Sequence, residues 1–373
     1  MRNFNIKRQI NKLYTLTTVS YFRIAGASWV ALLALRGFSL LQIGVLESIF
    51  HIASSCFEIP SGVVADVFGR KRTLALSKLV SVLSSLAMIL SDNFGTVAFA
   101  IAFSAISYNL ESGTIEALAY DSLKSVKQEE KYNRYASTEM MLYRITSSTA
   151  TLCAGFALWL TYKKAYAIDI FFGMIALGIV CSLREISGFS GADGEQKNEQ
   201  ENNKKICISE RLQNVITESW RFMKSNRKAR GIMIVNALIG AVSTLVLFFL
   251  QAKLPLAGLN EALLGPALFV MGLGAALGAK VVGYFPNWKY KKYIILSGIG
   301  VLFAFGMTFS GNPYLMVLGG FAGSFADDFL EVRTDILLND MIPSEQRATL
   351  ISVNSFTFSL VMIVMSTLMG SIM

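Results

Sequence analysis

The chain is poor in charged residues and in the residues that most often perform chemistry. Only 16% of its 373 residues are charged, whereas a soluble domain usually carries about 25%. There is one histidine, His51, and no HExxH, GxSxG or paired-cysteine pattern. We expect His51 to be a polar packing residue, and the missing motifs predict that the chain is not an enzyme and needs no cofactor.

Cysteine is also scarce. The four cysteines are Cys56, Cys153, Cys181 and Cys207, and no two of them have the spacing of a metal or redox site. The first three fall within apolar segments, and Cys207 falls within a basic stretch. We therefore expect four free thiols.

Apolar residues, in contrast, are abundant. They make up 53% of the chain, and the mean hydropathy is +0.50. About 20 apolar residues of helix cross a hydrocarbon core of about 30 Å. Eleven runs of about that length are bounded by charged residues or by Gly, Asn or Pro, namely 14–36, 40–64, 73–91, 95–119, 136–160, 164–183, 231–252, 261–285, 292–310, 313–334 and 347–370. The sequence predicts an all-α, polytopic bundle embedded in membrane lipid.

The net charge of +9 comes largely from basic residues in the loops between apolar runs. This placement indicates membrane topology and not nucleic-acid binding. If the N-terminus lies in the cytoplasm, the opposite side of the membrane holds only Arg36, Lys163, Lys164 and Lys253 as basic residues between the predicted spans. All other basic loops then face the cytoplasm, as the positive-inside rule requires. We expect a multi-pass protein of the inner or plasma membrane with a cytoplasmic N-terminus.

A long polar connection divides the chain. It predicts an N-terminal six-helix bundle at 1–183, a cytoplasmic linker at 184–230 and a C-terminal bundle of five spans at 231–373. Residues 189–205 have too little apolar surface to fold and should be disordered. Residues 208–223 place their apolar side chains on one helical face, which predicts a helix lying on the inner membrane surface or packed against the protein.

The most specific motif is GVVADVFGRKR, from Gly62 to Arg72. It resembles the signature loop of the major facilitator superfamily, in which a Gly, an Asp, a second Gly and a basic run follow the second span. Gly69 permits the positive φ of a tight reversal, and Gly62 permits close helix approach. In that family the loop latches the cytoplasmic side of the outward-open state. The resemblance implies this role for Gly62, Asp66, Gly69, Arg70 and Arg72.

Other segments extend the resemblance. Ser112–Lys124 and Ile342–Phe356 are similar to stretches in a bacterial branch of the superfamily, and Asp121 and Arg134 are expected to join the latch or else to be solvated loop charges. Residues 283–292 occupy the place of a second signature loop but lack its Asp and second Gly. The resemblance implies two pseudo-symmetric halves of six helices. About eleven spans are present, so we expect either a truncated chain or a naturally short form without the twelfth helix.

Charged residues inside the predicted spans indicate a transport path, because each costs at least about 2.5–3.5 kcal/mol to bury in lipid. Counted from the cytoplasmic ends, Arg23, Glu111, Arg144, Asp327 and Asp328 lie at similar depths of roughly 9–14 Å. We expect these five side chains to face one cavity.

Within this set, Glu111 is the first choice for a proton-binding site, since a buried carboxyl can load and release a proton. Arg23 is its expected counter-charge or an anion contact. Glu331 follows Asp327 on one helix face, and Glu58 lies near Pro60 in the second span. For the acids, ion pairs that merely hold helices together are the alternative.

The resemblance implies a monomeric secondary transporter that moves a small solute by alternating access. Proton-coupled efflux of an amphipathic, drug-like compound is our leading prediction. The fourth span lacks the Arg, and the fifth the Gly-Pro-rich motif, of the superfamily's drug/proton antiporters. A nutrient uptake transporter and a non-transporting relative are therefore the alternatives.

Overall fold

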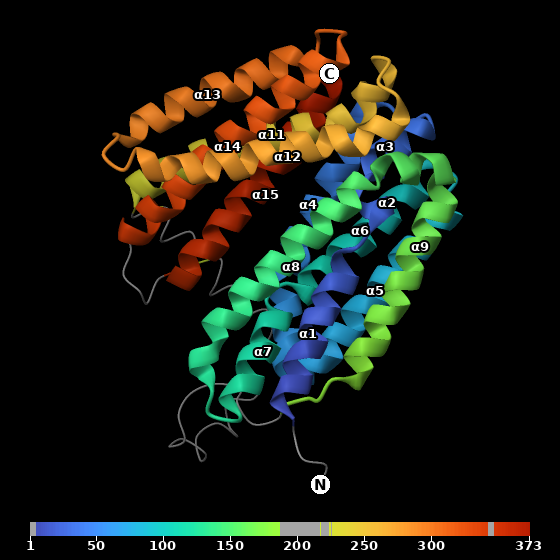
Figure 1. The fold of residues 1–373 in the computed structure, drawn as a ribbon, viewed down its shortest axis with the longest axis vertical. Coiled ribbons are helices and arrows are strands. Elements are labelled where there is room, and N and C mark those ends of the chain that lie inside the picture. Colours follow the sequence, from blue (N-terminus) through green and yellow to red (C-terminus); the bar gives the residue numbers. More distant parts are fainter. Residues whose placement is uncertain (1–4, 187–216, 218–223, 225, 342–346) are drawn as a thin grey trace. The chain divides into compact units, whose positions relative to one another are not determined.

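The computed structural model describes residues 5–186, 217, 224, 226–341 and 347–373, without the side chains of 59, 63, 66 and 347–352. Every secondary-structure element in this described part is a helix, which confirms the predicted all-α class. The α-helices (Figure 1) are α1 (Ile6–Tyr21), α2 (Ile24–Ala27), α3 (Trp29–Leu35), α4 (Leu40–Phe68), α5 (Arg70–Leu90), α6 (Phe94–Glu111), α7 (Thr114–Lys124), α8 (Tyr132–Leu152), α9 (Ala154–Ser182), α11 (Arg227–Leu256), α12 (Leu264–Val281), α13 (Tyr290–Met307), α14 (Pro313–Met341) and α15 (Arg347–Ile372). Short 3-10 turns occupy Glu129–Lys131, Glu261–Leu263 and Val282–Tyr284.

Eight helices of the described part are long and apolar enough to cross a membrane, so the predicted count of eleven is not confirmed. The runs at 14–36, 136–160 and 313–334 do not qualify. The first is divided among α1, α2 and α3, so no single piece has the required length. The other two are interrupted by charge, including Glu139 and Arg144 in α8 and Asp327 and Asp328 in α14.

Several predicted spans contain a break in the helix. The first is interrupted at Phe22 and Arg23, between α1 and α2. The fourth is interrupted between α6 and α7, where Gly113 has φ 73°, a conformation that suits glycine because it has no Cβ. The fifth and sixth meet inside α9, where Thr161 has φ 71° and reverses the chain.

The chain packs into two compact units. Unit 1 comprises Met1–Ala27, Ala53–Ala150 and Lys163–Asn214, and unit 2 comprises Ser28–Ile52, Thr151–Tyr162 and Val215–Met373. These units are defined by packing, and the division into bundles on either side of 184–230 stays a prediction.

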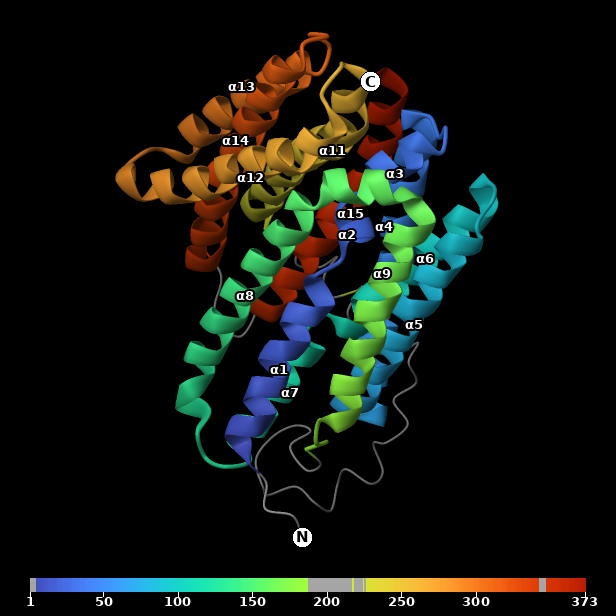
Figure 2. The ribbon, with the colours of Figure 1, turned by 45° about the vertical axis from the view of Figure 1, so that its right-hand side comes forward.

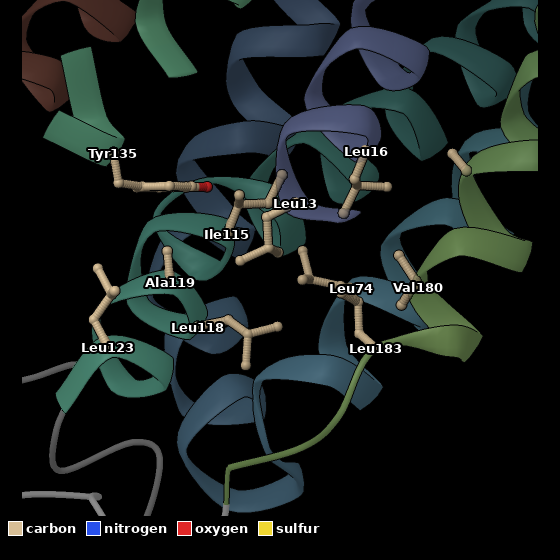
Figure 3. Packing of buried hydrophobic residues seen from close by; sticks show 11 residues of the cluster. Leu13, Leu16, Leu74, Ile115, Leu118, Ala119, Leu123, Tyr135, Val180 and Leu183 are labelled. Carbon is tan, nitrogen blue, oxygen red and sulfur yellow. The ribbon is translucent and has the colours of Figure 1, made fainter. Parts of the chain in front are cut away.

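Unit 1 has an apolar core where α1, α5, α7, α8 and α9 meet. Figure 3 shows Leu13 and Leu16 of α1 in this core with Ile115 and Leu118 of α7 and Leu74 of α5. All five side chains are at most 2% exposed. This core lies in the half of the unit that carries the predicted cytoplasmic loops, and it fixes the helices from which the polar side chains below project.

Unit 2 uses glycine to bring helices together. Gly274 and Gly278 form a GxxxG pattern on α12, and a Cβ at either position would lie 2.3 or 2.2 Å from a backbone oxygen of α14. Small residues at this spacing let two helix backbones approach closely within a membrane. The pattern explains why α12 and α14 run against each other along their length (Figure 1).

Unit 2 also joins helices from distant parts of the sequence through a glycine seam, which we define as Gly44, Gly155, Gly265 and Gly370. A Cβ at Gly44 would lie 2.2 Å from the backbone oxygen of Ser366, and one at Gly370 would lie 2.5 Å from that of Leu40. These contacts join α4 to α15 (Figure 2). Gly265 of α12 meets the backbone of Leu152, and Gly155 of α9 meets that of Glu261, at 2.1 and 2.5 Å from an added Cβ.

Candidate functional site

The signature loop makes the reversal that its glycine predicts. Gly69 has φ 91° and immediately precedes α5. A Cβ there would lie 2.9 Å from the carboxylate of Glu185, so both the conformation and the space favour glycine. Gly62 has no described atom within 4 Å of an added Cβ. Among the described residues, no other helix approaches Gly62 closely.

Among the other residues predicted to form a latch, the structure brings Arg70 and Asp121 together. Arg70 Nε lies 3.7 Å from Asp121 Oδ2, linking the start of α5 to α7. Arg72 and Arg134 are exposed. The side chain of Asp66 lies outside the described part of the structure.

The sequence prediction missed Glu185, which contributes to the same loop. Its Oε2 accepts a hydrogen bond from the backbone N–H of Lys71 at 3.0 Å, at the positive end of the α5 dipole. The preceding residue is held as well, because the amide of Gln9 accepts from the N–H of Arg184 and donates to its carbonyl, at 3.1 and 2.9 Å. The segment after α9 is thus tied to α1 and α5. No motif in the sequence marks Glu185.

Arg23 lies at the break between α1 and α2, opposite Asp169 of α9. Asp169 is 4% exposed, and its carboxylate accepts from the backbone N–H of Ala25 at 3.3 Å and of Gly26 at 3.0 Å. It thereby satisfies N–H groups that the break leaves free. Arg23 is near enough to attract the same carboxylate electrostatically.

Glu111 is paired with Lys78, not with Arg23 as expected. Lys78 Nζ of α5 forms a short salt bridge with Glu111 Oε1 at the end of α6, and the lysine side chain is 4% exposed. The sequence prediction passed over both Asp169 and Lys78. Each is a charge inside an apolar run, so the criterion that selected Glu111 would also have found them.

Two more acids lie in the interior of unit 1. Glu139 of α8 is 8% exposed and accepts a hydrogen bond from Thr17 Oγ1 of α1 at 3.3 Å. Glu116 of α7 has a buried Oε2 with no hydrogen-bond partner among the described residues. Glu111 acts electrostatically on both. Three carboxyl groups from α6, α7 and α8 therefore belong to one electrostatic cluster.

The remaining predicted path residues do not join this cluster. Arg144 is exposed and its guanidinium lies 5.7 Å from the Tyr143 ring centroid. Glu58 is half-buried on α4, beside Pro60. The common cavity expected for Arg23, Glu111, Arg144, Asp327 and Asp328 stays a prediction, because Asp327 and Asp328 belong to unit 2.

The acids of α14 lie within unit 2. Asp327 and Asp328 are half-buried and Glu331 is exposed. Gly240 of α11 leaves room for Asp327, since a Cβ there would lie 3.3 Å from Asp327 Oδ1 and 3.5 Å from the Phe358 ring of α15. Asp327 therefore occupies a position between α11, α14 and α15.

His51 makes polar contacts within α4 and to α15, which are contacts of a polar packing residue. Its Nε2 lies 3.3 Å from Glu47 Oε1 on α4, and its Nδ1 lies 3.4 Å from Ser359 Oγ on α15. The ring is 9% exposed. It adds a polar contact to the α4–α15 side of the glycine seam.

Three predicted segments cannot be compared with the structure. The disordered stretch at 189–205, almost all of the surface helix at 208–223 and the start of the Ile342–Phe356 segment lie outside the described residues.

Comparisons with known proteins agree with this arrangement of helices. A family model described as Major Facilitator Superfamily matches residues 13–326. The uncharacterized MFS-type transporter YxaM of Bacillus subtilis (strain 168) is 23% identical over 335 residues, which are 88% of this chain and 79% of the relative.

Two solved structures extend the comparison to three dimensions. The nucleoside transporter NupG has a TM-score of 0.74 at 14% identity, covering 99% of this chain and 91% of its own. A D-xylose-proton symporter has a TM-score of 0.66 at 13% identity, covering 96% of this chain and 89% of its own. At such low identities, the likeness shows the fold alone.

Proposed function

The chain belongs to the major facilitator superfamily of multi-pass membrane transporters, and we propose that it exports a small amphipathic compound in exchange for protons by alternating access. The observation that carries the proposal is the Lys78–Glu111 pair, a buried ion pair inside apolar helices. A charge in such a place is costly, and a transporter that binds and releases protons is the setting in which it has a use.

The ion pair suggests how proton binding is coupled to movement. A proton that binds Glu111 neutralises the carboxylate and removes its attraction to Lys78. The lysine charge, 4% exposed in its side chain, is then uncompensated, which is costly in a low-dielectric interior. We propose that the helices carrying the two residues, α5 and α6, rearrange in response, so that loading a proton favours a different conformation.

The same proposal assigns the path and the latch. The path residues for solute and protons are Arg23, Glu58, Glu111, Arg144, Asp327, Asp328 and Glu331. The latch residues are Gly62, Asp66, Gly69, Arg70, Arg72, Asp121 and Arg134. The Arg70–Asp121 contact at 3.7 Å supports the latch, and the Asp169 carboxylate beside Arg23 indicates that Arg23 is held in place at the helix break.

Inverted membrane vesicles carrying the chain test the proposal. A pH-gradient-sensitive dye is followed while cationic drugs, sugars and small acids are added one at a time. An exported compound should dissipate the gradient with the native chain and not with Glu111→Gln, whose side chain has nearly the same shape but binds no proton. Dissipation that persists unchanged in Glu111→Gln contradicts the assigned proton site.

Uptake is the second candidate, because the fold is also that of a D-xylose-proton symporter. Proton-coupled uptake has a distinct signature. Adding the solute to de-energised cells in a weakly buffered medium makes the medium more alkaline, as protons enter with the solute. This result, without dissipation in inverted vesicles, replaces export with uptake.

A further inference from the structure

In the cluster of Glu111, Glu116 and Glu139, two carboxyl groups have no basic partner in the described part of the chain once the neighbouring pairs are assigned. Lys78 is paired with Glu111, and Arg23 faces Asp169. Glu116 and Glu139 remain, and in the described part of the chain neither forms a salt bridge. The charge of Glu116 acts on Glu139 as a repulsion. Two carboxylates that repel each other in a mostly buried place do not both ionise readily, because neither has a basic partner among the described residues.

The phenol of Tyr135 is an independent sign of a ligand at the same place. Its side chain belongs to a residue only 2% exposed, and its hydroxyl has no hydrogen-bond partner among the described residues. Both Glu116 and Glu139 act on it electrostatically. Figure 3 shows the Tyr135 oxygen directed toward the turn of α7 that carries Ile115, the residue before Glu116. Buried hydroxyls are normally hydrogen-bonded, so this donor beside two acids indicates a small ligand shared among them.

Aromatic packing holds the phenol in that direction. The Tyr135 ring stacks on Tyr14 of α1, with centroids 5.1 Å apart, and its centroid is 6.1 Å from that of Tyr132. Thr17, one turn along α1 from Tyr14, donates to Glu139. The position of the donors is therefore set by α1 and α8 together.

We propose that Glu116 and Glu139 bind one exchangeable proton between them, beside Tyr135 and Thr17, and pass it to and from Glu111. The proton adds to one carboxylate oxygen as an O–H bond and changes the charge of the pair from −2 to −1. Release reverses the step. Proton binding by the pair stands by itself, whereas its transfer to Glu111 rests on the proposed proton-coupled function.

The order along the helices supports a relay. Glu116 is five residues closer than Glu111 to the end of α7 at Lys124, and the break at Gly113 lies between the two acids. That end is the predicted cytoplasmic side. The pair therefore lies between the cytoplasm and Glu111 in the predicted orientation.

Other titratable groups around the pair are part of the same environment. Tyr14 and Tyr21 come from α1, Lys78 from α5, Glu111 from α6, and Tyr132 and Tyr143 from α8. Lys78 and Glu111 compensate each other, and the tyrosines are neutral donors at physiological pH. The pair therefore keeps its excess negative charge.

Infrared difference spectroscopy on the purified full-length protein in lipid tests proton binding directly. Ordinary carboxyl groups ionise near pH 4, so a difference between spectra at about pH 5 and about pH 9 reports carboxyl groups that keep their proton to higher pH. They are compared between Glu111→Gln and the same chain with Glu116→Gln and Glu139→Gln added. The first should show the carbonyl band of protonated carboxylic acids that disappears at high pH, and the second should lack the part of that band that comes from Glu116 and Glu139. Identical spectra from the two proteins overturn the proposal.

A milder variant covers the case in which the triple variant does not fold. Thr17→Val preserves side-chain shape and removes the hydrogen bond to Glu139, so the carboxylic acid band should shift to higher frequency. A band that stays unchanged in this variant contradicts the pair as its source.

Transport assays distinguish proton binding by Glu116 and Glu139 from the transfer of that proton to Glu111. With an exported compound, the Glu116→Gln, Glu139→Gln double variant should lose proton-gradient dissipation while retaining counterflow, which needs solute movement without net proton movement. Dissipation at the native rate contradicts the relay. If no compound moves but the infrared band behaves as expected, the export proposal fails while proton binding by the pair survives.

Discussion

The polar interior of unit 1 and the glycine seam of unit 2 join helices by opposite means. In unit 1, charged side chains such as Lys78 and Glu111 reach between helices and neutralise each other. In the seam, glycines let the helix backbones meet directly. The backbone oxygens of Ser366 and Leu152 lie where a side chain at Gly44 or Gly265 would be. Under the proposed function, the first arrangement responds to a proton, whereas the glycine contacts carry no charge.

The difference matters for a carrier that changes conformation. Ion pairs inside a membrane protein have directional partners, and losing one partner leaves a costly charge. Close glycine contacts gain energy from many weak van der Waals interactions. They form and separate without leaving a charge behind. We expect the polar interior to decide when conformations exchange and the seam to determine how closely the helices meet.

The largest effect is expected when the Lys78–Glu111 pair is broken from one side. Lys78→Met leaves Glu111 without its partner and should destabilise the protein by about 3–5 kcal/mol, the usual cost of an uncompensated buried charge. Thermal unfolding of the purified protein in detergent measures the change. The Lys78→Met, Glu111→Gln double variant should regain most of the loss, and failure to do so would show that the lysine matters through packing alone.

The seam should be sensitive to a single methyl group. In Gly265→Ala, the new Cβ would lie 2.1 Å from the Leu152 backbone oxygen, so overpacking should cost about 1–3 kcal/mol. Gly272→Ala on the same helix is the matched control, because nothing described lies within 4 Å of a Cβ there. Equal melting temperatures for the two variants would contradict the seam as a site of tight packing.

A smaller effect is expected at Ser48, which supports the seam with hydrogen bonds. Its Oγ lies 2.7 Å from the Ile363 carbonyl oxygen, 2.7 Å from Ser366 Oγ and 2.9 Å from Thr367 Oγ1. Ser48→Ala should lower stability by about 1 kcal/mol. Ser371→Ala, at an exposed serine of the same helix α15, is the comparison, and a greater loss there would be evidence against the assignment.

The smallest stability effect is expected at the latch. Arg70 and Asp121 are 3.7 Å apart with partly exposed side chains, and such pairs contribute about 0–1 kcal/mol. Arg70→Gln should barely change the melting temperature but should alter transport rate in vesicles. Asp121→Asn should give the same phenotype, because it removes the same contact. A large stability loss with normal transport would contradict a conformational role.

Much of the fold could be predicted from the sequence, because a lipid environment restricts the backbone to few structures. Apolar runs of about 20 residues must be helical when no water is present to satisfy the backbone. Most of the predicted spans therefore have helical counterparts, such as 73–91 in α5 and 313–334 in α14. The breaks were harder to predict. The one at Arg23 depends on Asp169, more than 140 residues away, to satisfy its free N–H groups.

In the candidate site too, features set by neighbouring residues could be predicted, and features set by residues far away in the sequence could not. The reversal at Gly69 was predictable, because a positive φ is a property of the residue and its neighbours. The partner of Glu111 was not. Lys78, Arg23 and Arg144 are all basic residues in predicted spans, and helical position alone does not tell which of them faces the acid.

By itself, the sequence determined that this protein crosses a membrane as a helical bundle and that its signature loop turns at Gly69, because apolar run length and backbone conformation are set locally. Only the tertiary structure decided which charges meet. It placed Lys78 on Glu111, Asp169 at the broken first span, and Glu116 within electrostatic range of Glu139 and Tyr135. The physical reason is that electrostatic pairing depends on distances of a few ångströms between helices, and those distances are set by how the whole core packs.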